Sequence, residues 1–241
     1  MVPIERAVDL IILMTSPTEM VEISTRLEER GFTLGDEVVE ANAGIRSRLL
    51  PIAGGGFLEV ASELSPGSFA HGAGFGVTPR LVSVWYTTLD AAGDVERWRA
   101  LPGGERSTAG CGSWTRADGS SGYFIGIAPS PPVGDVFRDL FFGLRDRRLF
   151  PPPYLDRAET APAVRRVTVR GPEAGAWRRQ HVDFFSLPGD ERALRAGATE
   201  LVFDTGGSGA TELTETFAVP EPGPDMSFAA GRFEFVKEVT T

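Results

Sequence analysis

The sequence predicts an α+β fold assembled from a repeated strand–helix–strand–strand–strand (βαβββ) unit. Two observations support this prediction. A short apolar run followed by a turn and an amphipathic helix occurs three times along the 241 residues. Each predicted helix is then followed by strand and hairpin signals rather than by another helix. With only three substantial helices among many short strands, the sequence excludes a predominantly helical protein.

The first unit has the clearest boundaries. Its apolar run covers 8–14, and the Ser-Pro-Thr-Glu stretch at 16–19 forms a capping box with proline at the first helical position. Gly31 ends the helix. Strands over 45–50 and 57–61, joined by a glycine-rich turn, complete the unit.

The second and third units follow the same plan. In the second, Asp90 caps a helix that follows the apolar run 81–87. In the third, Pro172 opens a helix after the strand 164–169, and its apolar face carries His181. The strands predicted after these two helices cover 113–116, 123–128, 199–204, 211–219 and 233–236.

Proline and arginine mark the division of the chain. A segment rich in both residues separates the second unit from the third, and an aromatic run at 137–142 within it is either a strand or a short helix packed on the barrel. We therefore expect paired modules over 1–128 (units 7–64 and 80–128), a connector over 129–162 and a third module over 163–241.

Composition excludes several classes of protein. The chain has 24 basic and 33 acidic residues, a net charge of −9, which argues against nucleic acid as a partner. Cys111 is the only cysteine, so an internal disulfide and multi-cysteine metal sites are excluded. The apolar run Leu10–Met14 is too short to span a bilayer, and no signal-peptide pattern follows it. We expect a soluble, cytoplasmic protein without a membrane partner.

Four short stretches together resemble a known family. They are 26–32, 41–44, 48–51 and 56–60, which read RLEERGF, ANAG, RLLP and GFLEV. They are similar to the glyoxalase-like domain of the vicinal oxygen chelate superfamily, which includes glyoxalases, bleomycin-resistance proteins and dioxygenases. The resemblance implies paired βαβββ modules whose half-open mixed sheets surround a small-molecule pocket. A third module is then left unpaired, unless it completes the barrel with the first or meets a second chain in a homodimer.

The resemblance also implies where metal ligands would lie. Metal-dependent members place ligands on the first and last strands of each module, and the equivalent positions here are Leu10, Glu59, Arg166 and Glu234. Two carboxylates and an arginine without an imidazole form a poor site for a transition metal. We therefore expect no metal cofactor.

The same comparison selects the candidate catalytic residues. If Glu59 and Glu234 face one pocket, burial and like-charge repulsion would make one of them a general acid or base. Arg166 would then either balance that negative charge or bind a substrate carboxylate, in which case the small-molecule ligand would be anionic.

Three further residues are candidates for substrate binding. Trp85 and Tyr86 alternate along a strand, so one of the two should enter the pocket. His71 lies in a glycine-rich segment that is either a surface loop or a lid over the pocket.

These features lead to three functional hypotheses. The first is a metal-independent lyase, isomerase or cyclising enzyme that acts on a small organic molecule, such as an intermediate of secondary metabolism. The second is a non-catalytic protein that binds and sequesters a drug-like molecule. The third is a metal-dependent dioxygenase. The sequence names no substrate.

Overall fold

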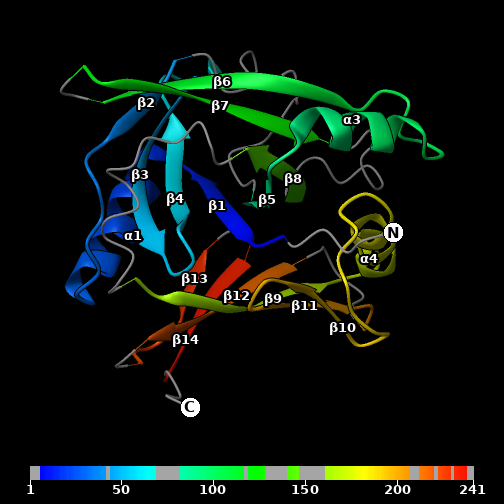
Figure 1. Ribbon diagram of the computed structural model, residues 1–241. Helices are drawn as coiled ribbons and strands as arrows, with labels where there is room; N and C mark the ends of the chain where they lie inside the picture. Colours follow the sequence, from blue (N-terminus) through cyan, green and yellow to red (C-terminus); the bar gives the residue numbers. More distant parts are fainter. Residues whose placement is uncertain are drawn as a thin grey trace.

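The computed structural model describes residues 6–41, 44–68, 82–116, 119–128, 140–146, 161–206, 212–219, 222–228 and 231–237. Within these ranges the fold is α+β, as predicted, with three helices and two sheets (Figure 1). One sheet closes into an eight-stranded barrel, and a six-stranded open sheet packs beneath it (Figure 1). None of the described helices is long and apolar enough to cross a membrane.

The barrel is built from two βαβββ modules. In each module the first strand pairs in parallel with the last: β1 with β4, and β5 with β8. Antiparallel pairs β1–β5 and β2–β6 join the modules and close the barrel, where only a half-open sheet was expected. In barrel order the strands are β1 (Val8–Thr15), β4 (Gly56–Glu63), β3 (Ile45–Ile52), β2 (Val38–Glu40), β6 (Thr108–Arg116), β7 (Ser121–Ala128), β8 (Leu140–Asp146) and β5 (Val82–Thr88).

The helices of these modules begin where the sequence indicates. In α1 (Pro17–Glu29), the Ser16 side chain accepts a hydrogen bond from the Glu19 backbone, and the Glu19 side chain accepts one from the Ser16 backbone. Gly31 follows its C-terminus at φ 83°, a conformation that favours glycine. In α3 (Ala91–Arg99), the Asp90 side chain accepts a hydrogen bond from Gly93.

The predicted boundary at residue 129 is too early. Strand β8 lies within the expected connector, pairs with both β5 and β7, and is the last strand of the second module. Its surroundings, rich in proline and arginine, resemble a linker, and only the pairing with β5 identifies it as part of the barrel. The first pair of modules therefore extends to Asp146.

The open sheet contains two reduced modules rather than one. The first lacks a strand: β9 (Ala163–Arg170), α4 (Ala174–Asp183), β10 (Ala193–Ala196) and β11 (Thr199–Asp204). The second lacks a strand and also the helix: β12 (Glu212–Val219), β13 (Met226–Phe228) and β14 (Gly231–Lys237). The parallel pairs β9–β11 and β12–β14, joined by antiparallel β9–β12, repeat the arrangement at the centre of the barrel. The third module therefore pairs within the chain with a further reduced module, and it does not complete the barrel with the first module.

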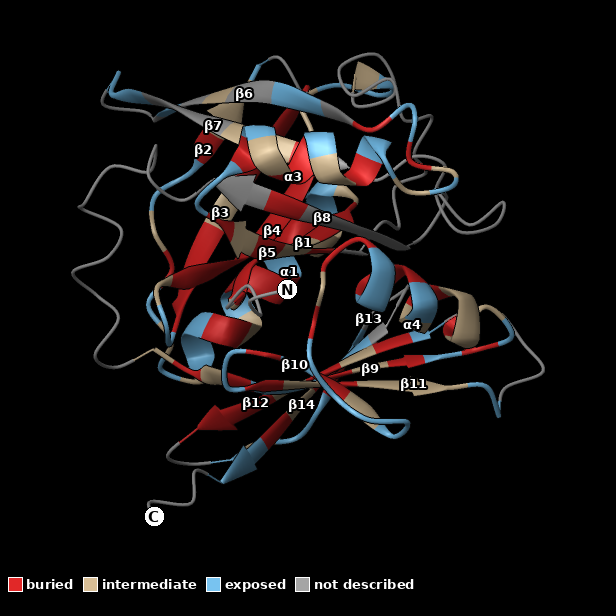
Figure 2. Ribbon diagram, turned by 45° about the vertical axis from the view of Figure 1, so that its right-hand side comes forward, coloured by how far each residue is buried: buried red, intermediate tan, exposed pale blue. Residues whose placement is uncertain are grey.

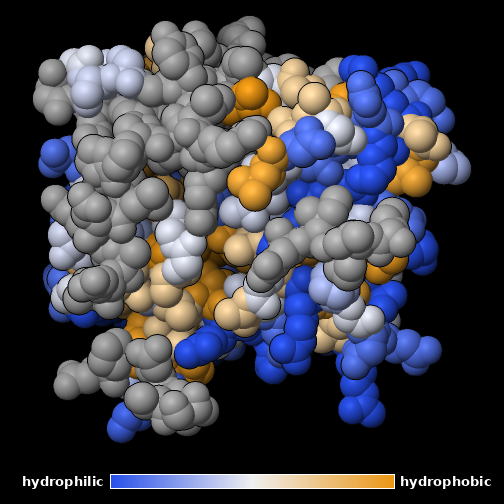
Figure 3. Space-filling model, viewed as in Figure 1, coloured by the Kyte–Doolittle hydropathy of each residue, from blue (hydrophilic) through white to orange (hydrophobic). Residues whose placement is uncertain are grey.

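The two sheets share one hydrophobic core. One cluster of buried residues includes members of the barrel strands, of the helices and of the open sheet, and Figure 2 shows buried positions in both sheets. On the face shown in Figure 3, apolar side chains gather between the two halves, whereas much of the rim is hydrophilic. At one edge of this interface Phe32 stacks on Phe235, with the Arg30 guanidinium 4.4 Å from the Phe235 ring centre.

A buried ion pair lies at the centre of the contacts between the two halves. The Arg6 guanidinium donates to the Asp94 carboxylate at 2.6 Å, to the Thr87 carbonyl at 3.0 Å and to the Phe185 carbonyl at 2.7 Å. Burial by itself would raise the pKa of Asp94, but hydrogen bonds from Arg6, Thr88 and Arg97 lower it overall. This cluster connects the start of β1, the end of β5, α3 and the segment after α4.

A second polar contact crosses the same interface. The Tyr86 hydroxyl lies 2.9 Å from Nε2 of His181, and Nδ1 of His181 lies 2.6 Å from the Trp177 carbonyl. Burial lowers the pKa of His181 from 6.5 to about 3, so the ring is neutral at pH 7. The neutral ring therefore donates from Nδ1 to Trp177 and accepts at Nε2 from Tyr86.

Asp94→Asn should strongly destabilise the protein. It leaves the buried Arg6 charge without its counter-charge, which typically costs about 3 kcal/mol. Urea unfolding at pH 7 measures the loss. As a control, Asp204→Asn removes a carboxylate from the exposed pair with Arg170 and should have a much smaller effect. Equal losses in the two variants would contradict a central role for the Arg6–Asp94 pair.

Tyr86→Phe should lower the free energy of unfolding by about 1–3 kcal/mol, because Nε2 of His181 is left buried without a donor. Urea denaturation checks this. The double variant Tyr86→Phe/His181→Phe should lose less than the sum of the two single variants, since it removes both partners together. Additive losses would show that the hydrogen bond contributes nothing.

Candidate functional site

The inner face of the barrel is the candidate functional site. Side chains alternate along each strand, so Ile11, Leu13, Leu58 and Val60 face outward into the shared core. A separate inner cluster contains Leu10, Val38, Leu49 and Phe57, with Ile12 and Trp85 packed against it.

Accessible surface remains on this inner face. Ile12 and Trp85 lie in the middle of their strands yet are only partly buried. Their outward-facing neighbours, Ile11 and Tyr86, have no exposed surface. The side chains described inside the barrel therefore do not fill it completely.

Glu59 is a carboxylate on this inner face. It follows the inward-facing Phe57 by two positions on β4, and only 2% of its surface is exposed. Its register partners on the two adjacent strands are Ile12 of β1 and Leu49 of β3, both apolar. Glu59 thus lies beside apolar side chains on both neighbouring strands.

Trp85 and Tyr86 point to opposite sides of β5. Trp85 joins the inner cluster, and its ring lies next to Gly126 of β7. Tyr86 is fully buried on the outer side, where it contacts His181 and Phe185. Alternation along the strand therefore places Trp85, and not Tyr86, inside the barrel.

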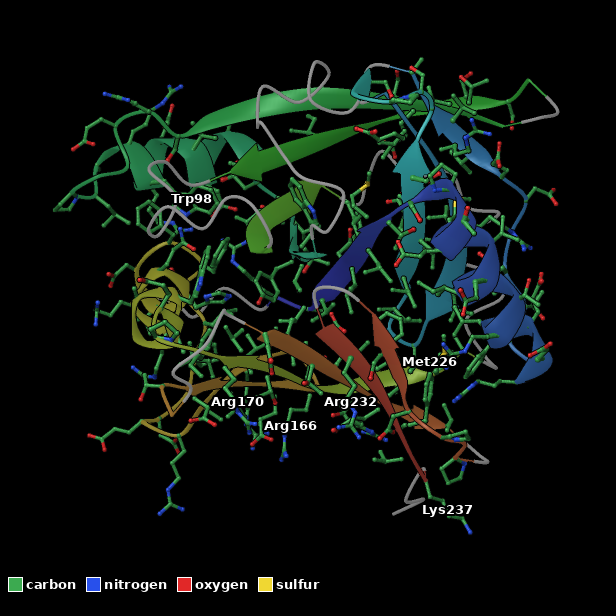
Figure 4. All side chains as sticks on the ribbon, turned by 180° about the vertical axis from the view of Figure 1, so that it is seen from behind. Trp98, Arg166, Arg170, Met226, Arg232 and Lys237 are labelled. Carbon is green, nitrogen blue, oxygen red and sulfur yellow. The ribbon has the colours of Figure 1, made fainter. Side chains whose placement is uncertain are left out.

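Arg166 and Glu234 lie elsewhere, on the lower face of the open sheet. The pairings of Arg166 with Thr216, and of Thr216 with Glu234, place all three side chains on that face. Arg166 forms an ion pair with Glu200 at 2.6 Å, and its side chain is 54% exposed. Figure 4 shows Arg166, Arg170 and Arg232 extending away from the barrel. Glu59 and Glu234 therefore do not share a pocket.

His71 lies outside the described residues, so its role as a lid residue stays a prediction.

Comparisons with known proteins show the fold but not a relative in sequence. No protein-family profile matches the chain, and neither does any curated protein sequence. A hypothetical protein from Staphylococcus aureus has a similar structure, with a TM-score of 0.70 and 10% sequence identity over 98% of this chain and 100% of that one. This similarity shows that the two chains share a fold, and the paired βαβββ modules identify that fold. The chain has the vicinal oxygen chelate fold.

Two further solved structures match the chain with lower TM-scores. A mutant 4-hydroxymandelate synthase from Streptomyces coelicolor has a TM-score of 0.49 and 12% identity over 89% of this chain and 71% of that one. Methylmalonyl-CoA epimerase from Mycobacterium tuberculosis has a TM-score of 0.36 and 16% identity over 58% of this chain and 87% of that one.

Among the side chains that the structure describes, the barrel does not offer the metal ligands typical of metal-dependent proteins with the vicinal oxygen chelate fold. Leu10, at the predicted ligand position on the first strand, faces inward and pairs with Phe57, two residues before Glu59. Ile12 pairs with Glu59 itself. Neither the Leu10 nor the Ile12 side chain carries an atom that could bind a metal. Among the residues described, no group of three or more histidine, cysteine, aspartate or glutamate side chains is arranged to hold a metal ion. These residues do not fit a metal, and no chemical step is assigned to one.

Sequence reasoning missed one buried carboxyl group. Glu215 of β12 has no exposed surface, and neither of its carboxyl oxygens has a hydrogen-bond partner within the described part of the chain. Burial raises its pKa from 4.5 to about 8, so it is mostly protonated at pH 7. The signal was present, because alternation along β12 places Glu215 with the apolar Leu213 and Phe217.

Glu215→Gln should change how stability depends on pH. The folded state keeps Glu215 protonated up to about pH 8, whereas the unfolded chain ionises near 4.5. The contribution of the protonated Glu215 carboxyl to the free energy of unfolding is fully present below pH 4.5 and is lost as the pH rises to 8. The variant should therefore gain stability relative to the natural protein over this range, by up to about 1.4 kcal/mol per pH unit.

Urea unfolding between pH 4.5 and 9 measures this difference. Glu212→Gln, on the exposed side of the same strand, is the control and should leave the pH dependence unchanged. A constant difference between Glu215→Gln and the natural protein would show that Glu215 ionises in the folded state as it does in the unfolded chain.

Proposed function

We propose that this protein is an enzyme that binds a small organic molecule inside its barrel and moves a proton with Glu59. The observation that carries the proposal is the placement of this carboxylate on a partly accessible inner face, between apolar side chains of the two neighbouring strands. The vicinal oxygen chelate fold is compatible with it, since the first strands of two paired modules line one enclosed site.

Glu59 has a direct chemical role in this proposal. Its carboxylate accepts a proton from a carbon or hydroxyl group of the bound molecule, and the resulting carboxylic acid donates that proton back. Return to a different carbon gives an isomerase, and donation to a leaving group gives a lyase. The apolar partners Ile12 and Leu49 keep water from competing for the proton.

Sequestration of a ligand is the second candidate. The partly exposed Trp85 ring supports it, because an aromatic wall binds a flat molecule without any chemistry. This alternative requires binding but no role for Glu59 in turnover, so the same experiment separates the two. A dioxygenase is the weakest candidate. It depends on metal ligands, and Ile12 and Leu49, which lie beside Glu59 on the adjacent strands, do not supply them.

Glu59→Gln should abolish turnover but preserve binding. A thermal-shift screen of small metabolites identifies ligands, and NMR of each mixture detects conversion. Loss of the carboxylate should lower kcat at least about 100-fold, while the dissociation constant changes only a few-fold. Glu22→Gln, the same change on the exposed side of α1, is the control. A chelator added to the natural protein should leave turnover intact.

Two outcomes would contradict the proposed function. Unchanged turnover in Glu59→Gln would remove the assigned base. Tight binding without conversion in either protein would instead support sequestration.

A further inference from the structure

The proposed function leaves the buried carboxyl group of Glu215 unused. Glu215 lies on the face of the open sheet that packs against the barrel, and neither of its carboxyl oxygens has a hydrogen-bond partner among the described residues. Its register partners are Val167 of β9 and Phe233 of β14. Leu213 and Phe217 lie on the same face of β12. All four neighbours are apolar and buried, so the open sheet supplies no group that would compensate a charge at this position.

The other side of this boundary does not compensate such a charge either. The titratable groups that the barrel and α4 place at the boundary are Arg6, Asp9, Arg30, Tyr86, Asp94, Arg97 and His181. None of them contributes to the pKa of Glu215, which burial raises and only its own backbone N–H lowers. The carboxyl group is therefore neutral at pH 7 while the two halves are packed together.

The boundary between the halves is the place where water can reach this carboxyl group. Within the open sheet, β12 is hydrogen-bonded to β9 on one side and to β14 on the other, so opening the sheet would break both sets of hydrogen bonds. The described contacts across the boundary are made mainly by side chains, as in the hydrogen bond from Arg6 to the Phe185 carbonyl. Within the described ranges one backbone hydrogen bond, from Ala53 to Pro162, joins the two halves. Separating the halves therefore breaks fewer backbone hydrogen bonds than opening either sheet.

We propose that Glu215 makes this boundary sensitive to pH: its carboxyl group keeps its proton while the halves are packed and releases it to water when they separate. The packed group ionises with a pKa of about 8, and the hydrated group ionises near the ordinary 4.5. Separation is thus favoured progressively as the pH rises from 4.5 to 8, by up to about 10-fold per pH unit, and no further above pH 8. This inference does not depend on Glu59 or on the proposed function.

The hydrogen bond between Tyr86 and His181 at the same boundary does not titrate in this range. Burial lowers the pKa of His181 to about 3 and raises that of Tyr86 well above 10. A pH dependence between 5 and 8 therefore cannot come from this pair, and any surface group that titrates there is present in the variants as well.

Hydrogen exchange of two buried side-chain N–H groups tests the inference. The Nε–H of Arg6 and the indole N–H of Trp98 both donate across the boundary, to the carbonyls of Phe185 and Phe184. NMR follows their exchange between pH 5 and 8, with correction for the intrinsic exchange rate at each pH. In the natural protein their protection should fall by up to about 10-fold per pH unit.

Three variants isolate the carboxyl group. In Glu215→Gln and in Glu215→Leu the protection of both reporters should stay constant with pH, since no group is left to ionise on separation. The leucine variant matches the apolar neighbours, so it decides the question if the buried amide of the first variant prevents folding. Glu212→Gln, on the exposed side of the same strand, is the control and should behave as the natural protein does.

Low concentrations of urea distinguish separation of the halves from global unfolding. Separation exposes less surface, so exchange of the two reporters should depend on urea much less than exchange of the backbone amides that pair β3 with β4. The inference is overturned if the variants at position 215 keep the pH dependence of the natural protein. It is also overturned if the reporters respond to urea as strongly as the barrel amides, because Glu215 would then affect only global unfolding.

Discussion

The arrangement of the two sheets depends on the buried charge of Arg6. A guanidinium without access to water must have its donors satisfied, and here Asp94, the Thr87 carbonyl and the Phe185 carbonyl accept from it. These acceptors come from α3, from the end of β5 and from the segment after α4. The barrel and the open sheet therefore meet in the one arrangement that supplies all of them, and Tyr86 and His181 add a hydrogen bond across the same boundary.

Strand β5 links this boundary to the candidate site. Tyr86 on its outer side holds His181, while the preceding residue, Trp85, lies inside the barrel with Leu10 and Phe57. Because alternate residues of a strand point to opposite faces, fixing the outer side also fixes the position of the Trp85 ring. The interface thus supports the wall of the site although it contributes no residue to the inner face.

The second half of the chain repeats the first in reduced form. Its two modules keep the central four-stranded arrangement β11–β9–β12–β14, but each has one strand fewer than a full module, and the second also has no helix. Without a second helix on β12, the barrel itself covers that side of the sheet, which explains why Glu215 is enclosed there. The opposite face carries Arg166, Glu200 and Glu234 and remains exposed, so it resembles an ordinary solvated sheet surface.

Local patterns were enough to predict most elements of this protein. The capping box at Ser16 and Glu19, the cap at Asp90 and the alternation around Trp85 and Tyr86 act within a few residues, so the sequence by itself determined the helices, most strands and the repeated unit. Strand β8 was assigned to the connector, as either a strand or a short helix, and the fourth, helix-less module was missed, because pairing between distant strands defines both. The grouping of candidate residues also depended on tertiary structure: Glu59 faces into a barrel that closes through the β2–β6 pair, and Glu234 lies on a separate sheet. Which residues share a site is decided by contacts between segments far apart in sequence, and no local pattern encodes those contacts.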